Sequence, residues 1–262
     1  MLSVNVLSVL IMAALACESA PAAADGLEPG AATAEAWLDR AAGRIADLET
    51  IRCDLDYVRI EGVGFIDSKE TRKGKLIYLP RPPARFAVRF DRLIVDRRTQ
   101  KLSQWYIFDG RWGVDRNDTE KIFIKRQLVP PDAEPAKTNP LALGDGPFKV
   151  PFTADKEQLL KRLTVELLPS DAKDPPNTVH LRFEPKPAQR MNITRIDVWY
   201  DETLLVPVRA ETLDDGPNLE IVTLKAIQLD VPVDLEVFDV SAPPKGEGWT
   251  VEIKPYEQKR SR

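Results

Sequence analysis

Apolar and polar residues alternate with a period of two along much of the chain. In residues 51–57 every odd position is apolar and every even position is charged, and residues 85–90 and 178–183 alternate in a similar way. This period is typical of a β-strand with one buried and one solvated face. Strands of this kind occur in antiparallel sheets that are covered on one side. The three segments therefore predict an antiparallel sheet.

Further strand candidates lie between turn signals such as Asp109-Gly110, Asp201-Glu202 and 214–217. They follow one another at a spacing of about 10 residues, which favours one large curled sheet or an open barrel. We predict a single, mainly β domain. The less regular strand candidates are 70–79, 92–96, 103–109, 111–115, 120–127, 163–168, 193–200, 204–213 and 218–229.

Two segments predict helices. From about residue 33 to 48, Trp37, Ala41 and Ile45 recur along one face, and Thr33 can cap the helix. Residues 154–163 predict a second helix. It follows a proline-rich excursion, residues 128–151, in which a long regular element is excluded. Such excursions are often lids or binding loops.

The N-terminus predicts export. Residues 2–16 are uncharged and mostly apolar, and they are fewer than the roughly 20 residues of a membrane-spanning helix. They fit the apolar region of a secretory signal, with small residues after it. Cleavage after Ala24 and cleavage before Cys17 are both open, because residues 14–17 resemble a lipobox that would make Cys17 a lipid anchor. A partly buried N-terminal helix is the alternative.

The domain organisation follows from these elements, and no internal boundary is evident. We predict a signal peptide over residues 1–24 (or a lipoprotein signal ending before Cys17), a flexible lead-in over 25–32, one folded domain over 33–256 and a basic tail over 257–262.

Composition narrows the class of protein. The net charge is only -4 and charges of both signs are interspersed, whereas a nucleic-acid surface has a concentrated basic patch. Once Cys17 is removed or lipidated, Cys53 has no partner for an intrachain disulfide. Because Cys53 alternates with apolar neighbours, we expect a small buried hydrophobic residue.

Catalytic chemistry has little support in the sequence. His180 is the only histidine, and we expect it to be exposed on the polar side of its strand. Asp115, Asp118 and Glu120 cluster where a hairpin tip is a simpler interpretation than a metal site. No nucleophile elbow, zinc or nucleotide-binding motif occurs. We therefore expect a binding or carrier protein that is not an enzyme and has no metal or cofactor.

Four segments resemble one family in the same order along the chain. Residues 74–86 (GKLIYLPRPPARF), 105–114, 138–143 and 238–251 are similar to segments of the periplasmic outer-membrane lipoprotein carriers, the LolA-like proteins. The resemblance covers about residues 33–253. It implies a strongly curved, incomplete antiparallel barrel whose opening is covered by helices.

The resemblance also implies an activity and partners. A LolA-like carrier is a monomer that shields lipoprotein acyl chains in an apolar cavity between an inner-membrane donor and an outer-membrane acceptor. The alternative is an envelope sensor module or a membrane-anchored lipid-binding lipoprotein of the same fold. Either way the chain would act in the periplasm, with lipid as its ligand and no nucleic acid.

Site residues are also implied by the resemblance. Arg81 matches the family arginine that tethers the helical lid by hydrogen bonding; an arginine in a tight turn is the alternative. Which sheet face looks inward depends on register, and ordinary core packing is the alternative for every lining residue. The lining candidates are Leu76, Tyr78, Phe86, Val88 and Phe90 on the sheet and Trp37, Leu38 and Ile45 on the helical lid.

Overall fold

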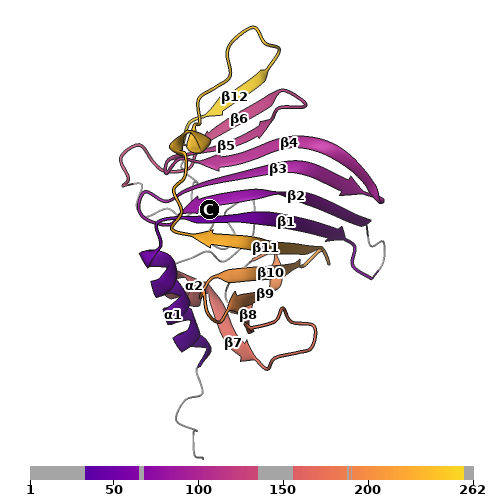
Figure 1. The fold of residues 1–262 in the computed structure, drawn as a ribbon, viewed down its shortest axis with the longest axis vertical. Coiled ribbons are helices and arrows are strands. Elements are labelled where there is room, and N and C mark those ends of the chain that lie inside the picture. Colours follow the sequence, from indigo (N-terminus) through magenta and orange to yellow (C-terminus); the bar gives the residue numbers. More distant parts are fainter. Residues whose placement is uncertain (1–32, 65–67, 135–155, 188, 190, 257–262) are drawn as a thin grey trace, which may run out of the picture. The chain divides into compact units, whose positions relative to one another are not determined.

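One sheet dominates the computed structural model, which describes residues 33–64, 68–134, 156–187, 189 and 191–256. These residues form a 12-stranded sheet in the order β12-β6-β5-β4-β3-β2-β1-β11-β10-β9-β8-β7 (Figure 1). The strands are β1 (Ile51–Glu61), β2 (Ser68–Leu79), β3 (Arg85–Val95), β4 (Arg98–Phe108), β5 (Trp112–Asn117), β6 (Ile122–Gln127), β7 (Leu163–Leu168), β8 (Thr178–Pro185), β9 (Ile193–Asp201), β10 (Pro207–Asp214), β11 (Leu219–Leu229) and β12 (Thr250–Lys254).

The sheet is antiparallel apart from its last pair, β12 on β6, which is parallel. The edge strands β12 and β7 are not paired with each other, so the sheet stays open. β1 lies in its middle, paired with β2 on one side and β11 on the other. The predicted fold class, a single curved antiparallel sheet forming an incomplete barrel with few helices, is confirmed.

The first helix agrees with its prediction. α1 (Ala34–Asp47) begins after Thr33, whose Oγ1 accepts a hydrogen bond from Ala36 N at 3.2 Å. Its apolar stripe, Trp37, Leu38, Ala41 and Ile45, is buried. The second helix, α2 (Lys156–Arg162), packs against α1 and β7. No helix among the described residues combines the length and apolarity that a membrane crossing needs.

Several expected boundaries differ from the structure. The segments 85–90 and 92–96 form the single strand β3, because a bulge between Phe90 and Arg92 carries the strand through Asp91. The sequence analysis missed β12. Its alternation covers only five residues, and its hydrogen-bonding partner β6 is distant in the sequence. The predicted signal and the 138–143 segment lie outside the described residues.

A small second core lies on the outer side of β2 to β6. Ala87, Ile107, Val114 and Phe123 pack there with Phe238 of the short helix η2 (Leu235–Phe238). This side of the sheet carries the even positions of β1, so it is the face opposite to the apolar side of residues 51–57. The sheet is thus covered differently on its two faces.

Gly74 permits close contact at the bulge between β2 and β3. A Cβ at this position would lie 1.9 Å from the backbone oxygen of Arg89. The register shifts between Lys73 and Gly74 at the same place, and bulges bend and twist strands. Glycine at position 74 therefore contributes to the curvature of the sheet.

We expect Gly74→Ala to lower the free energy of unfolding by about 3 kcal/mol, because the backbone has to shift to admit the methyl group. The matched control is Gly43→Ala in α1, where an added Cβ meets nothing within 4 Å. Helix propensity predicts that this change stabilises the protein by about 0.5–1 kcal/mol. Urea denaturation of both variants measures the difference, and equal effects would contradict the role given to Gly74.

Candidate functional site

The candidate site is the inner face of the sheet, defined by the odd positions of β1 and the side chains in register with them. In β1 these are Ile51, Cys53, Leu55 and Tyr57, all buried. The apolar surface continues in both directions across the sheet. It includes Leu76, Tyr78, Phe86, Val88, Phe90 and Phe108 on β2 to β4, and Leu224, Val222, Ala210, Val198, Ile196, Leu181, Phe183 and Leu163 on β11 to β7.

The structure brings the five predicted sheet residues together. Tyr78 lies opposite Phe86, Leu76 lies opposite Val88, and Phe90 is next to this pair in β3. All five are at most 3% exposed. Phe86 also stacks with Phe108, with ring centroids 6.0 Å apart. These residues share one face because the register of β1, β2 and β3 places every second side chain on the same side.

The predicted helical residues lie elsewhere along the sheet. Trp37, Leu38 and Ile45 belong to the buried stripe of α1, and α1 has β7 and α2 as its backbone neighbours. The helix therefore lies near the β7 edge (Figure 1), while the five sheet residues are on β2 and β3. The helical candidates therefore lie beside a different part of the sheet from the five candidates on β2 and β3.

Arg81 contacts the end of α1. Its Nη2 donates to the backbone oxygen of Asp47, the last residue of the helix, at 2.7 Å. Its Nη1 donates to Glu49 Oε1 at 3.0 Å. A cation at a helix C-terminus is stabilised by the unpaired carbonyls and the helix dipole. Arg81 is thus hydrogen-bonded to the C-terminal end of the first helix.

Beside its apolar residues, the inner face also carries a group of polar side chains on β2, β4 and β5. Gln104 Nε2 donates to Tyr106 Oη at 2.6 Å, and Arg72 Nε lies 2.7 Å from Glu70 Oε1. This Nε is buried without a well-directed hydrogen bond, so the Glu70 contact is an ion pair only. Burial raises the pKa of Asp115, against the opposing effects of Gln104, Arg126 and Arg72.

The sequence analysis missed this polar group. Arg72 and Asp115 occur in strands whose alternation is irregular, and nothing local shows which face they occupy. The register of β2 with β1 places Arg72 directly opposite Tyr57 on the inner face. Burial raises the pKa of Tyr57 as well. The inner face thus has one region of polar side chains beside its apolar residues.

The raised pKa of Asp115 predicts a pH dependence. A carboxyl group with a folded-state pKa above its unfolded value contributes stability at low pH that is lost as pH rises through the folded pKa. Asp115→Asn removes this titration. We expect the variant to gain stability relative to wild type as the pH rises from about 3 to 7, because the neutral amide avoids the desolvated charge. Chemical denaturation across this pH range measures the difference. The carboxyl of Asp118 has a lowered pKa, so Asp118→Asn should show the opposite trend.

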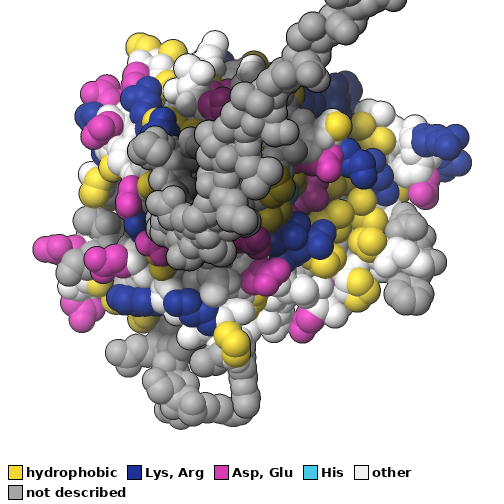
Figure 2. All heavy atoms as spheres, turned by 90° about the horizontal axis from the view of Figure 1, so that it is seen from below, with side chains coloured by type: hydrophobic (Ala, Val, Ile, Leu, Met, Phe, Trp, Pro, Cys, Tyr) yellow, Lys and Arg dark blue, Asp and Glu magenta, His cyan; other side chains and the backbone are white. Residues whose placement is uncertain are grey.

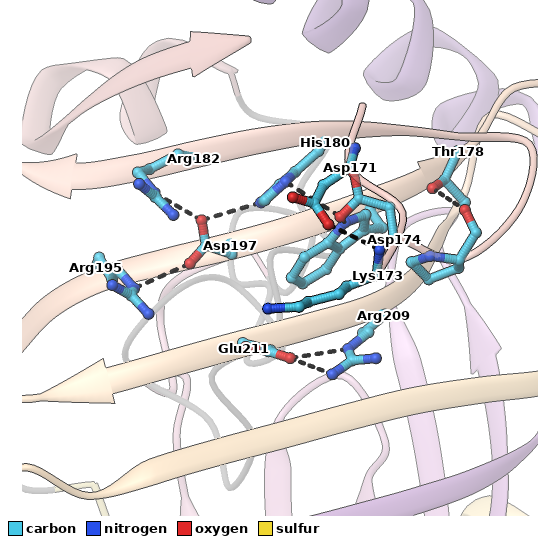
Figure 3. A network of polar contacts seen from close by, with 12 residues as sticks. Asp171, Lys173, Asp174, Thr178, His180, Arg182, Arg195, Asp197, Arg209 and Glu211 are labelled. Carbon is cyan, nitrogen blue, oxygen red and sulfur yellow. Dashed lines mark hydrogen bonds and ion pairs between the residues drawn. The ribbon is translucent and has the colours of Figure 1, made fainter. Parts of the chain in front are cut away.

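On the outer face, a second polar network joins β8 and β9, with the Arg209–Glu211 pair of β10 beside it (Figure 3). His180 Nε2 lies 3.1 Å from Asp197 Oδ1, and its ring stacks on Trp199 with centroids 4.2 Å apart. Asp197 also accepts from Arg182 Nε at 2.7 Å and pairs with Arg195 Nε at 3.0 Å. The network binds neighbouring strands together through one buried carboxylate.

The expectation that His180 is exposed was wrong. Its side chain is only 10% exposed, because Trp199 covers one side of the ring and Asp174 lies 3.6 Å from Nδ1. Thr178, the hydroxyl residue drawn nearby in Figure 3, donates to Pro175 O at 2.7 Å and not to His180. The histidine therefore has two aspartate neighbours but no activated hydroxyl among the labelled residues.

Of the other predicted features, Cys53 lies where expected, and the predicted acidic cluster does so only in part. Cys53 is buried, and burial raises the pKa of its thiol to about 12. Asp118 and Glu120 are at the β5–β6 turn, while Asp115 is inside β5. In the described part of the chain, no three His, Cys, Asp or Glu side chains are placed to hold a metal ion. On the face shown in Figure 2, charges of both signs are interspersed around hydrophobic side chains.

The fold and the site define a class: an open, curved antiparallel sheet with a continuous apolar inner face and helices at one side. No family model matches the sequence, and no curated protein does. Solved structures are similar in fold at low identity, and their similarity adds nothing about activity.

Three of the similar structures illustrate the range. An uncharacterized conserved protein from Thermus thermophilus is 8% identical, with 85% of this chain and 99% of that chain covered and a TM-score of 0.49. A LolA superfamily protein from Nitrosomonas europaea is 10% identical, with 79% and 97% covered and a TM-score of 0.36. The complex of MucA and MucB from Pseudomonas aeruginosa is matched at 15% identity, with 78% and 60% covered and a TM-score of 0.42.

Proposed function

We propose that the protein is an exported, non-catalytic lipid-binding protein that holds acyl chains against the inner face of its sheet. The observation that carries the proposal is the continuity of the apolar inner face from β3 to β7. Transfer of an acyl chain through water requires such a surface, since each CH₂ that is buried contributes about 0.8 kcal/mol. The sequence segments that resemble LolA-like carriers support the same ligand class.

In this proposal the ligand is a lipoprotein acyl chain, and the protein acts in the periplasm. Leu76, Tyr78, Phe86, Val88 and Phe90 line the binding surface. α1, with Trp37, Leu38 and Ile45 on its buried side, acts as a lid that Arg81 holds. A sensor module or an anchored lipoprotein would use the same surface. In the anchored form, Cys17 of the lipobox-like residues 14–17 would carry the lipid. Mass spectrometry of the mature N-terminus distinguishes the anchored lipoprotein from the soluble carrier, because an acylated Cys17 would exclude a freely diffusing carrier.

Ligand binding is tested by extracting lipid from the purified protein and by titrating it with a fluorescent acyl probe. We expect Val88→Thr to weaken probe binding about tenfold, because it places a hydroxyl group on the inner face at nearly constant volume. Val114→Thr is the matched control, since Val114 is also buried but lies on the outer face. No lipid in the extract and no probe uptake by wild type would reject the proposal.

Arg81 is tested by its effect on exchange. We expect Arg81→Leu to change the free energy of unfolding by less than about 1 kcal/mol, because the pair with Glu49 is exposed. Loss of the hydrogen bond to Asp47 O should release the acyl probe about tenfold faster. Glu49→Gln is the control, since it removes the ion pair and keeps the bond to the helix. Unchanged release in Arg81→Leu would make Arg81 a turn residue.

A further inference from the structure

The outer face of β2, β3 and β4 carries a dense group of cations. We call it the basic face and define it by Lys73 and Lys75 on β2, Arg89 and Arg92 on β3, and Lys101 on β4. The register of these strands places all five on the side opposite to the inner face. Four of them are exposed, and the side chain of Lys73 is 34% exposed.

The cations of the basic face lie directly opposite one another. Lys75 pairs with Arg89, Lys73 with Arg92, and Arg92 with Lys101. Like charges in directly opposite positions destabilise an antiparallel sheet. The chain as a whole has a net charge of -4, so this concentration of positive charge runs opposite to the overall charge of the protein. The three like-charge pairs therefore oppose folding.

Three acids lie close to the basic face, fewer than its five cations. Asp54 and Asp56 on β1 lie opposite Lys75 and Lys73. Asp56 Oδ2 lies 3.5 Å from Lys73 Nζ, but it is shared with Lys225 Nζ at 2.6 Å. Asp91 contacts its neighbour Arg92, Nε to Oδ1, at 3.1 Å. The guanidinium of Arg89 lies over the ring of Trp105, 4.8 Å from its centroid. That contact orients Arg89 and leaves its charge in place.

We propose that the basic face docks the protein on an anionic phospholipid surface. The positive charge of the basic face calls for a negatively charged partner, and the breadth of the face indicates an extended surface. The cations are spread over three adjacent long strands (Figure 1), so they match a broad charged surface. Lysine contributes a point charge on a flexible stem, which suits headgroups without fixed geometry. Each cation held near such a surface strengthens partitioning by about fivefold.

This surface is independent of the proposed acyl-binding function. The basic face and the inner face are opposite sides of the same strands, so each can fail without the other. Vesicle binding that persists in a variant unable to bind the acyl probe would separate the two. A protein that takes up acyl chains but ignores anionic vesicles would retain its proposed function and overturn only the docking.

The test is co-sedimentation with phosphatidylcholine vesicles that contain or lack phosphatidylglycerol. We expect binding only to the anionic vesicles, and we expect it to disappear at about 1 M salt, where the Debye length falls to about 3 Å. No binding to anionic vesicles, or binding that salt does not weaken, overturns the proposal. So does binding to soluble polyglutamate without binding to vesicles, since that identifies an acidic polypeptide as the partner.

A charge reversal separates docking from folding. Lys101→Glu places opposite charges at the pair with Arg92, so the Tm should stay equal or rise. The same change should weaken partitioning about 25-fold, because one attraction is lost and one repulsion is added. Lys173→Glu alters the net charge equally at an exposed position on the loop before β8, and we expect its partitioning to stay within about twofold of wild type.

A second variant replaces two cations by uncharged residues and adds no negative charge. Lys75→Gln with Arg89→Gln removes two cations and a like-charge pair, so the protein should remain folded and bind about 25-fold more weakly. If Lys173→Glu weakened binding as much as Lys101→Glu, net charge would account for the result and the basic face would not. The proposal would then be overturned.

Discussion

The register of the strands is the constraint on which the rest of this structure depends. Because side chains alternate along a strand, a shift by one residue would exchange the two faces. β1 is paired on both sides, so its register sets the faces of β2 and β11 and, through them, of the whole sheet. The apolar inner face and the basic outer face both exist only while this register holds.

Curvature is the second consequence of the same pairing. Bulges occur where β1 meets β11, where β2 meets β3 and where β3 meets β4. At one of them Gly74 lets the backbone of β3 approach more closely than any side chain would permit. A bent sheet with apolar side chains on one face provides a surface for an acyl chain, while α1 is held at its end by Arg81.

The two faces are stabilised in different ways. The inner face is mainly apolar, with one polar group around Arg72 and Asp115. The outer face has a small core under η2, a buried carboxylate network around Asp197 and, on β2 to β4, a group of cations that outnumbers the acids beside it. The directly opposed cations repel one another within the sheet, which is why they indicate a partner.

Local sequence determined the elements, and tertiary structure decided their neighbours. Alternation in residues 51–57 and the helical stripe with its Thr33 cap predicted β1 and α1, because both patterns depend on neighbouring residues. Alternation also put Phe86 and Val88 on one side of their strand, but only the register of β2 with β3 placed Leu76 opposite Val88. Alternation could not show that His180 is buried, because Trp199 and Asp197 reach it from another strand. Nor did alternation reveal β12, the place of Arg72 on the inner face or the row of Lys73, Arg92 and Lys101. Each of these depends on which strands pair and in which register, and a local pattern does not contain that information.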